Sequence, residues 1–133
     1  MLIFIDANIL IYQLELHPSL GSIASARLDL LHAAGDQVVV SDLVRLECRV
    51  GPIKASDEPL LTKFDGFFSL PSVKVVGLSA DVCDRAALIR ARYGFRTPDS
   101  LNLAAAVVSG CELFLTNDAR LSRFTDLIVE MLS

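Results

Sequence analysis

The sequence predicts an α/β protein: a three-layer α/β/α sandwich around a central, mainly parallel sheet of four to five strands. Short apolar segments of strand length alternate along the chain with longer segments of helical periodicity. The strand segments are mainly apolar, and residues 2–5 (LIFI) are wholly so, as expected for strands covered on both faces of a parallel sheet. The chain has 133 residues and no linker-like stretch, so we expect one domain over residues 1–133.

The expected strands cover residues 2–5, 37–40, 73–76, 112–116 and 127–131. The expected helices cover residues 8–14, 19–34, 42–50, 59–70, 79–93, 97–109 and part of 117–124. The pair Ser41-Asp42 is typical of a helix start, and Gly51-Pro52 is typical of a helix end. Thr97 is expected as an N-cap with Pro98 at the first helical position.

Two apolar stripes follow from these helix assignments. In the helix over 19–34 the expected inner face is formed by Ile23, Ala26, Leu30 and Ala33. In the helix over 59–70 the stripe is formed by Leu60, Leu61, Phe64, Phe67 and Phe68. The second stripe has two interpretations, core packing or the wall of a groove for a partner helix.

Composition excludes several classes of protein. No apolar run approaches the roughly 18 residues of a membrane span, and the start of the chain lacks the basic segment of a signal peptide, so we expect a cytoplasmic protein with no membrane association. Cys48, Cys83 and Cys111 have no zinc-site spacing and are expected to be buried thiols. The net charge is −4, so a polyanionic ligand would need local cations or a bound metal.

Two carboxylates follow strands directly. Asp6 comes at the end of the first strand, and Asp118 comes after the fourth. The carboxyl ends of parallel strands meet at one edge of the sheet, where ligands of α/β proteins bind. Each acid also has an ordinary explanation, because Asp is common in turns and helix caps.

Two further carboxylates lie on helices. Glu47 shares a helical face with Leu43, Val44 and Val50, which places an acid on an apolar side. Asp99 is in the first turn of its helix, where the helix dipole favours an anion. The ordinary explanations are a surface ion pair for Glu47 with Arg45 or Lys54, and a simple helix-start role for Asp99.

Taken together, Asp6, Glu47, Asp99 and Asp118 predict a metal site. Carboxylates that lie close together repel one another and need a counter-charge. Hard divalent cations with oxygen ligands supply that charge, and Mg²⁺ typically keeps several waters beside one or two protein carboxylates. We therefore expect Mg²⁺ or Mn²⁺ as the cofactor. Four negative charges could balance two such ions.

At this point the chain resembles a known family, the PIN-domain ribonucleases, and in particular the VapC-type toxins of toxin–antitoxin pairs. The resemblance rests on segments 4–10 (FIDANIL), 97–106 (TPDSLNLAAA) and 115–118 (LTND), with Glu47 between the first two. Each motif is weak alone, whereas the ordered set with its spacing is specific. It covers essentially the whole chain.

The resemblance implies that Asp6, Glu47, Asp99 and Asp118 are both the metal ligands and the catalytic residues of an RNA-hydrolysing enzyme. It implies supporting roles for Asn8 and for Thr116 or Asn117, an antitoxin partner and homodimers. One departure is Asn102, where many relatives carry a His. An amide can donate and accept hydrogen bonds but cannot titrate, which puts any proton-transfer role at this position in doubt.

The hypothesis from sequence is hydrolysis of RNA phosphodiesters with metal-activated water. Asp6 would be the central ligand, Glu47 and Asp99 would complete the site of one ion, and Asp118 would hold a second ion or a water. Arg96, three residues before Asp99, is the candidate for substrate binding among the arginines of 85–96, although such arginines commonly form a solvated face.

Two other functions remain open from sequence. An aspartyl-nucleophile phosphatase also begins with an apolar strand ending in Asp, but it would need a second Asp where this chain has Asn8. A non-catalytic domain that binds RNA or protein is the other alternative. Such a domain has no need of four carboxylates.

Overall fold

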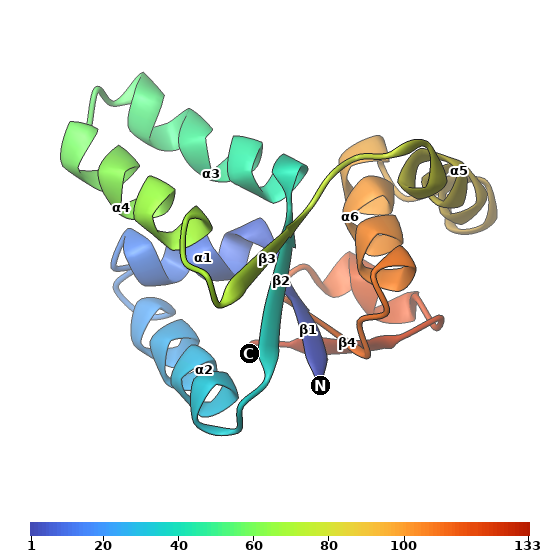
Figure 1. Ribbon diagram of the computed structural model, residues 1–133, viewed down its shortest axis with the longest axis horizontal. Helices are drawn as coiled ribbons and strands as arrows, with labels where there is room; N and C mark the ends of the chain where they lie inside the picture. Colours follow the sequence, from blue (N-terminus) through green and yellow to red (C-terminus); the bar gives the residue numbers. More distant parts are fainter.

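The computed structural model describes residues 1–133 and contains a five-stranded parallel sheet in the order β3-β2-β1-β4-β5. The strands are β1 (Leu2–Ile5), β2 (Gln37–Ser41), β3 (Val73–Val76), β4 (Leu113–Thr116) and β5 (Ile128–Met131). Helices cover both faces, so the predicted three-layer α/β/α class is confirmed (Figure 1).

Helices α1 to α4 lie on one side of the sheet and α5 and α6 on the other (Figure 1). Their bounds are α1 (Ala7–Leu14), α2 (Gly21–Ala33), α3 (Asp42–Lys54), α4 (Glu58–Phe68), α5 (Ala80–Tyr93) and α6 (Thr97–Val108), with a short 3₁₀ helix η1 (Ala119–Arg123) between β4 and β5. No helix has the length and apolar character that a membrane crossing requires.

The core is centred on β1 and β4, two of the three inner strands of the sheet. Phe4 and Phe114 are direct neighbours in the parallel register, and both are fully buried. Their rings stack with centroids 5.0 Å apart and planes 5° from parallel. The outer strands β3 and β5 contain no fully buried residue, as expected at sheet edges.

The expected inner face of the helix over 19–34 is wrong. Ile23 and Leu30 are 42% and 64% exposed, and Ala26 and Ala33 are exposed as well. The inner face is instead formed by Ala24, Leu28 and Leu31. Those residues are spaced i, i+4, i+7, which is as typical of one helical face as the i, i+3, i+7, i+10 spacing of the expected residues. The apolar pattern of this helix was therefore compatible with two faces, and packing selected the second.

The expected end of the third helix is also wrong. Helix α3 continues through Gly51 and Pro52 to Lys54, and the chain leaves the helix at Ser56, which has a positive φ of 52°. Pro52 is buried, so packing of its ring offsets the backbone hydrogen bond that a proline inside a helix cannot make. At α6 the N-cap is Arg96, one residue before the expected Thr97.

Of the remaining core predictions, the one for the cysteines is wrong in part and the one for α4 is supported. Cys48 and Cys111 are buried, whereas Cys83 is exposed, so the prediction of three buried thiols is wrong for Cys83. Phe64 and Phe68 are buried, which favours core packing for the stripe of α4.

Replacing Phe114 with Ala should lower the free energy of unfolding by about 3–5 kcal/mol, because it removes the ring stacked on Phe4 and leaves a cavity. Urea denaturation measures the change. Leu30→Ala is the control, and its exposed position predicts a change within about 0.5 kcal/mol. Equal effects of the two substitutions would contradict the observed packing.

Candidate active site

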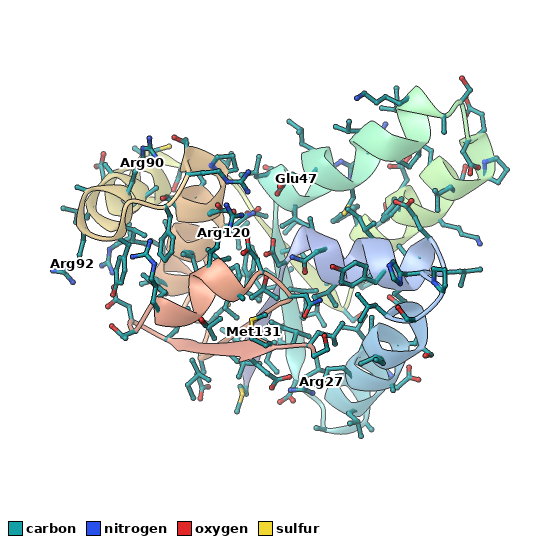
Figure 2. All side chains as sticks on the ribbon, turned by 180° about the vertical axis from the view of Figure 1, so that it is seen from behind. Arg27, Glu47, Arg90, Arg92, Arg120 and Met131 are labelled. Atoms are coloured by element: carbon teal, nitrogen blue, oxygen red, sulfur yellow. The ribbon has the colours of Figure 1, made fainter.

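The candidate site lies at the carboxyl edge of the sheet, beside β1. β1 pairs with β2 on one side and with β4 on the other, so the strand order changes direction at β1. The carboxyl end of β1 is therefore the topological switch point of the sheet. Glu47 on α3 and Arg120 on η1 lie at this end of the molecule, whereas Arg92 lies at the outer end of α5 (Figure 2).

Asp6 connects the core to the site. Its backbone N–H donates to the Leu115 carbonyl at 2.9 Å, which extends the pairing of β1 with β4 by one residue. Its side chain caps α1 by accepting from the Ala7 N–H at 2.9 Å. The hydroxyl of Thr116 donates to the other carboxylate oxygen, Oδ2, at 2.7 Å. Asp6 is therefore held by the sheet and by a helix start, not by an exposed turn.

Asn8 and Thr116 join the loop after β4 to the start of α1. The Asn8 amide group donates to Thr116 Oγ1 at 3.3 Å and lies 3.4 Å from Asp6 Oδ2, while Asn8 Oδ1 accepts from the Asn117 N–H at 3.1 Å. Thr116 Oγ1 also accepts from the Asp118 N–H at 3.1 Å. The side chain of Asn117 instead accepts hydrogen bonds from Ser133, so only its backbone contributes here.

Glu47 is held by Asn102, the position where the sequence departs from many relatives. Asn102 Nδ2 donates to Glu47 Oε1 at 3.1 Å, and Asn102 Oδ1 accepts from the Ser41 hydroxyl at 2.6 Å. Ser41 in turn caps α3 by accepting from the Val44 N–H. Asn102 and Ser41 are 3% and 0% exposed, so this buried chain fixes Glu47 relative to β2 and α6.

Three of the four acids, Asp6, Glu47 and Asp99, repel one another electrostatically. Burial raises the pKa of Asp6 from 3.8 to about 6, the hydrogen bonds from Thr116 and Ala7 oppose that rise, and repulsion from Glu47 and Asp99 adds to it. The pKa of Glu47 is also raised, first by burial and then by repulsion from Asp99, against the hydrogen bond from Asn102. Asp6, Glu47 and Asp99 are therefore mutually repulsive.

The fourth acid, Asp118, is paired with an arginine. Arg120 donates from Nε to Asp118 Oδ1 at 2.9 Å and from Nη2 to Oδ2 at 2.5 Å, and these bonds lower the pKa of Asp118. Arg96 similarly donates from Nε to Asp99 Oδ2 at 3.0 Å. These two arginines, with Asp99 and Arg123, line a cavity of about 260 Å³ beside the acids.

The structure thus brings all four predicted acids to one edge of the sheet, together with Asn8, Thr116 and Arg96. Sequence reasoning missed Ser41 and Arg120. Ser41 was interpreted only as a helix cap, although its position at the end of β2 was a signal that it reaches the same edge. Arg120 follows Asp118 by two residues, a spacing that the tight 3₁₀ turn converts into an ion pair.

The acids fit a divalent cation in their chemistry. All are hard oxygen donors, and the repulsion among Asp6, Glu47 and Asp99 would be relieved by positive charge. No three His, Cys, Asp or Glu side chains lie close enough together to hold an ion directly. A cation held through one or two carboxylates and several waters, as Mg²⁺ commonly is, matches this spacing best.

The raised pKa of Asp6 predicts a pH-dependent stability in EDTA. Because the folded protein holds the Asp6 proton more tightly than the unfolded chain, stability from this group is full below pH 4 and is lost between about pH 4 and 6. The loss amounts to about 2–3 kcal/mol. Urea denaturation from pH 4 to 7 should therefore show that the free energy of unfolding declines less with pH in Asp6→Asn than in the wild type.

The control is Asp29→Asn, on the exposed side of α2, which leaves Asp6 in place and should keep the wild-type decline. Parallel pH profiles for the wild type and Asp6→Asn would contradict the assignment of the decline to Asp6.

Comparison with solved structures shows the same fold in several proteins. The crystal structure of VapBC2 from Rickettsia felis bound to a promoter DNA fragment is 23% identical, with 98% of each chain covered and a TM-score of 0.81. DNA-bound VapBC from Salmonella typhimurium is 20% identical over 100% of each chain, with a TM-score of 0.80. VapC20 from Mycobacterium tuberculosis, described as a toxin that cleaves the Sarcin-Ricin loop, is 16% identical over 95% of this chain and 98% of that one, with a TM-score of 0.74.

No curated protein sequence matches this chain significantly. The model of the PIN domain family matches residues 3–127, a segment that begins within β1, contains β2, β3 and β4, ends just before β5 and includes every acid of the site. The chain therefore belongs to the PIN domain family.

Proposed function

We propose that this protein is a metal-dependent endoribonuclease that hydrolyses RNA phosphodiesters with Mg²⁺ or Mn²⁺, and that residues 1–133 act as one nuclease domain. The observation that carries the proposal is the placement of Asp6, Glu47 and Asp99 at the switch point of the sheet, where Asp6 and Glu47 are partly buried and Asp99 repels both. An arrangement that costs stability in the unloaded protein is characteristic of a site built for a charged ligand.

Each residue of the site has a separate role in this proposal. Asp6 is the central acid, because it is the one fixed by the sheet, by Thr116 and by the cap of α1. Glu47 is aimed by Asn102, and Asp99 is presented by the first turn of α6. A divalent cation bound by these acids would supply a water nucleophile at neutral pH and charge for the phosphate oxygens. Asn102 acts here as a positioning residue and moves no proton.

RNA binding needs positive charge, since the chain carries a net charge of −4. Arg96 and Arg120 provide it beside the acids, and both side chains are largely exposed, at 64% and 57%. We propose that Arg96 contacts substrate phosphate. The structural similarity to VapC20, a toxin described as cleaving the Sarcin-Ricin loop, supports RNA over other phosphodiesters.

The proposal includes a biological role as the cytoplasmic toxin of a type II toxin–antitoxin pair, with an antitoxin partner and a homodimeric state. Similarity to proteins described as VapBC complexes supports the partner. A second support is an apolar stripe on the outer side of α3, formed by Leu46, Val50 and Ile53 at 58%, 44% and 57% exposure. Val50 of this stripe lies three residues after Glu47, about one turn along α3, so a protein bound to the stripe would contact the helix that carries Glu47.

Asp6→Asn should lower cleavage of a single-stranded RNA at least 100-fold, because the central acid loses its charge. EDTA should abolish cleavage by the wild type, and Mg²⁺ or Mn²⁺ should restore it. A fluorogenic RNA assay with identically purified proteins measures both effects, and Asp29→Asn is the charge-matched control with unchanged activity. Full activity of Asp6→Asn, or of the wild type in EDTA, would refute the proposal.

Asn102→Ala should weaken Mn²⁺ binding about 10–100-fold, because Glu47 loses the amide that aims it. Isothermal titration calorimetry measures the affinity. Asn117→Ala is the matched control, because the Asn117 side chain accepts hydrogen bonds from Ser133 and none of its hydrogen bonds goes to an acid of the site. This variant should keep the wild-type affinity for Mn²⁺. An unchanged affinity for Mn²⁺ in Asn102→Ala would contradict the role of Asn102 in orienting Glu47 toward the ion.

A further inference from the structure

The four acids of the site fall into two groups with different neighbours. Asp6 accepts hydrogen bonds from Ala7 and Thr116, and Glu47 accepts one from Asn102, all of them uncharged donors. The charge of Asp99 repels both carboxylates. Asp118 is instead paired with the guanidinium of Arg120, whose hydrogen bonds lower the pKa of Asp118 against the opposing effect of burial.

Arg120 donates hydrogen bonds to both oxygens of the Asp118 carboxylate. Nε and Nη2 bond to the two different carboxylate oxygens, at 2.9 and 2.5 Å, and the Arg120 backbone N–H adds a third bond to Oδ1 at 3.1 Å. Nη2 also lies 3.9 Å from Asp99 Oδ2. Arg120 therefore bridges Asp118 and Asp99, as a bound cation would.

The charges of the two groups point to one ion. Asp6, Glu47 and Asp99 carry three negative charges when ionised, and Arg96 compensates one of them through its ion pair with Asp99. The remaining two charges match a single divalent cation. Asp118 and Arg120 form a neutral pair, which leaves no net negative charge to attract a second.

We propose that Arg120 takes the place of a second metal ion, so that the site binds one divalent cation, held by Asp6, Glu47 and Asp99 directly or through water, and Arg120 is the fixed cation at Asp118. This inference rests on the proposed nuclease function and makes it more specific. It revises the expectation that Asp118 holds a second ion. A guanidinium suits this position because its planar fork can hold a carboxylate on one side while its exposed side meets a phosphate oxygen.

Mn²⁺ stoichiometry, measured without RNA, tests the proposal. Electron paramagnetic resonance of free Mn²⁺, with Mn²⁺ raised to 1 mM, counts the ions bound per chain. We expect one ion in the wild type and two in Arg120→Ala, where Asp118 becomes free. Arg92→Ala, on the exposed far end of α5, removes the same charge and should keep one ion (Figure 2).

Two more variants separate charge from fold. Arg120→Lys keeps a cation beside Asp118 and should bind one ion, and the double variant Asp118→Asn/Arg120→Ala should return to one. Circular dichroism confirms that each variant is folded, as expected for substitutions of partly exposed side chains.

Two ions in the wild type, or one ion in Arg120→Ala, would overturn the role of Arg120 while leaving the nuclease function intact. No bound Mn²⁺ in any variant would instead refute the metal-dependent function itself. The two failures are therefore distinguishable without an activity measurement.

Discussion

The position of the Asp6 carboxylate at the end of the innermost strand is the constraint on which the site depends. Its backbone continues the pairing of β1 with β4, so the side chain cannot move away from the sheet edge without breaking the register of the core. The hydrogen bonds from Thr116 and Ala7 reduce the cost of burying its charge, but they do not cancel it, and the pKa stays near 6. Glu47 and Asp99 add repulsion, so the folded protein without a ligand carries an electrostatic penalty at neutral pH.

The structure confines that penalty by giving every acid a specific polar neighbour. Asp6 has Thr116, Glu47 has Asn102, Asp99 has Arg96 and Asp118 has Arg120. The neighbours come from different parts of the chain: β4, α6, and the segments that flank the acids. Packing of the sheet and of α6 thus sets the geometry of the site, and loss of packing near β4 should reach the acids through Thr116.

The alternation of apolar strands and helices predicted the layered fold. The acids that follow strands, the acid in the first turn of a helix and the acid on an apolar helical face predicted the candidate site, because all of these are properties of local sequence. The face of α2 was not predictable in this way, since two apolar faces were compatible with the pattern and tertiary packing selected between them. The continuation of α3 through Pro52 depends on burial of the proline ring, which is also a property of tertiary packing. Ser41 and Arg120 were missed for a related reason. Their roles depend on partners, Asn102 and Asp118, whose proximity is set by the sheet topology and by a 3₁₀ turn.

The central claim is that a divalent cation binds where Asp6, Glu47 and Asp99 converge. Paramagnetic relaxation by Mn²⁺ locates the ion directly through broadening of backbone amide signals in NMR spectra of the ¹⁵N-labelled protein. The account predicts that substoichiometric Mn²⁺ broadens the amides around Asp6, Glu47 and Asp99 first, and that this pattern disappears in Asp6→Asn. Broadening centred elsewhere, or an unchanged pattern in Asp6→Asn, would contradict it.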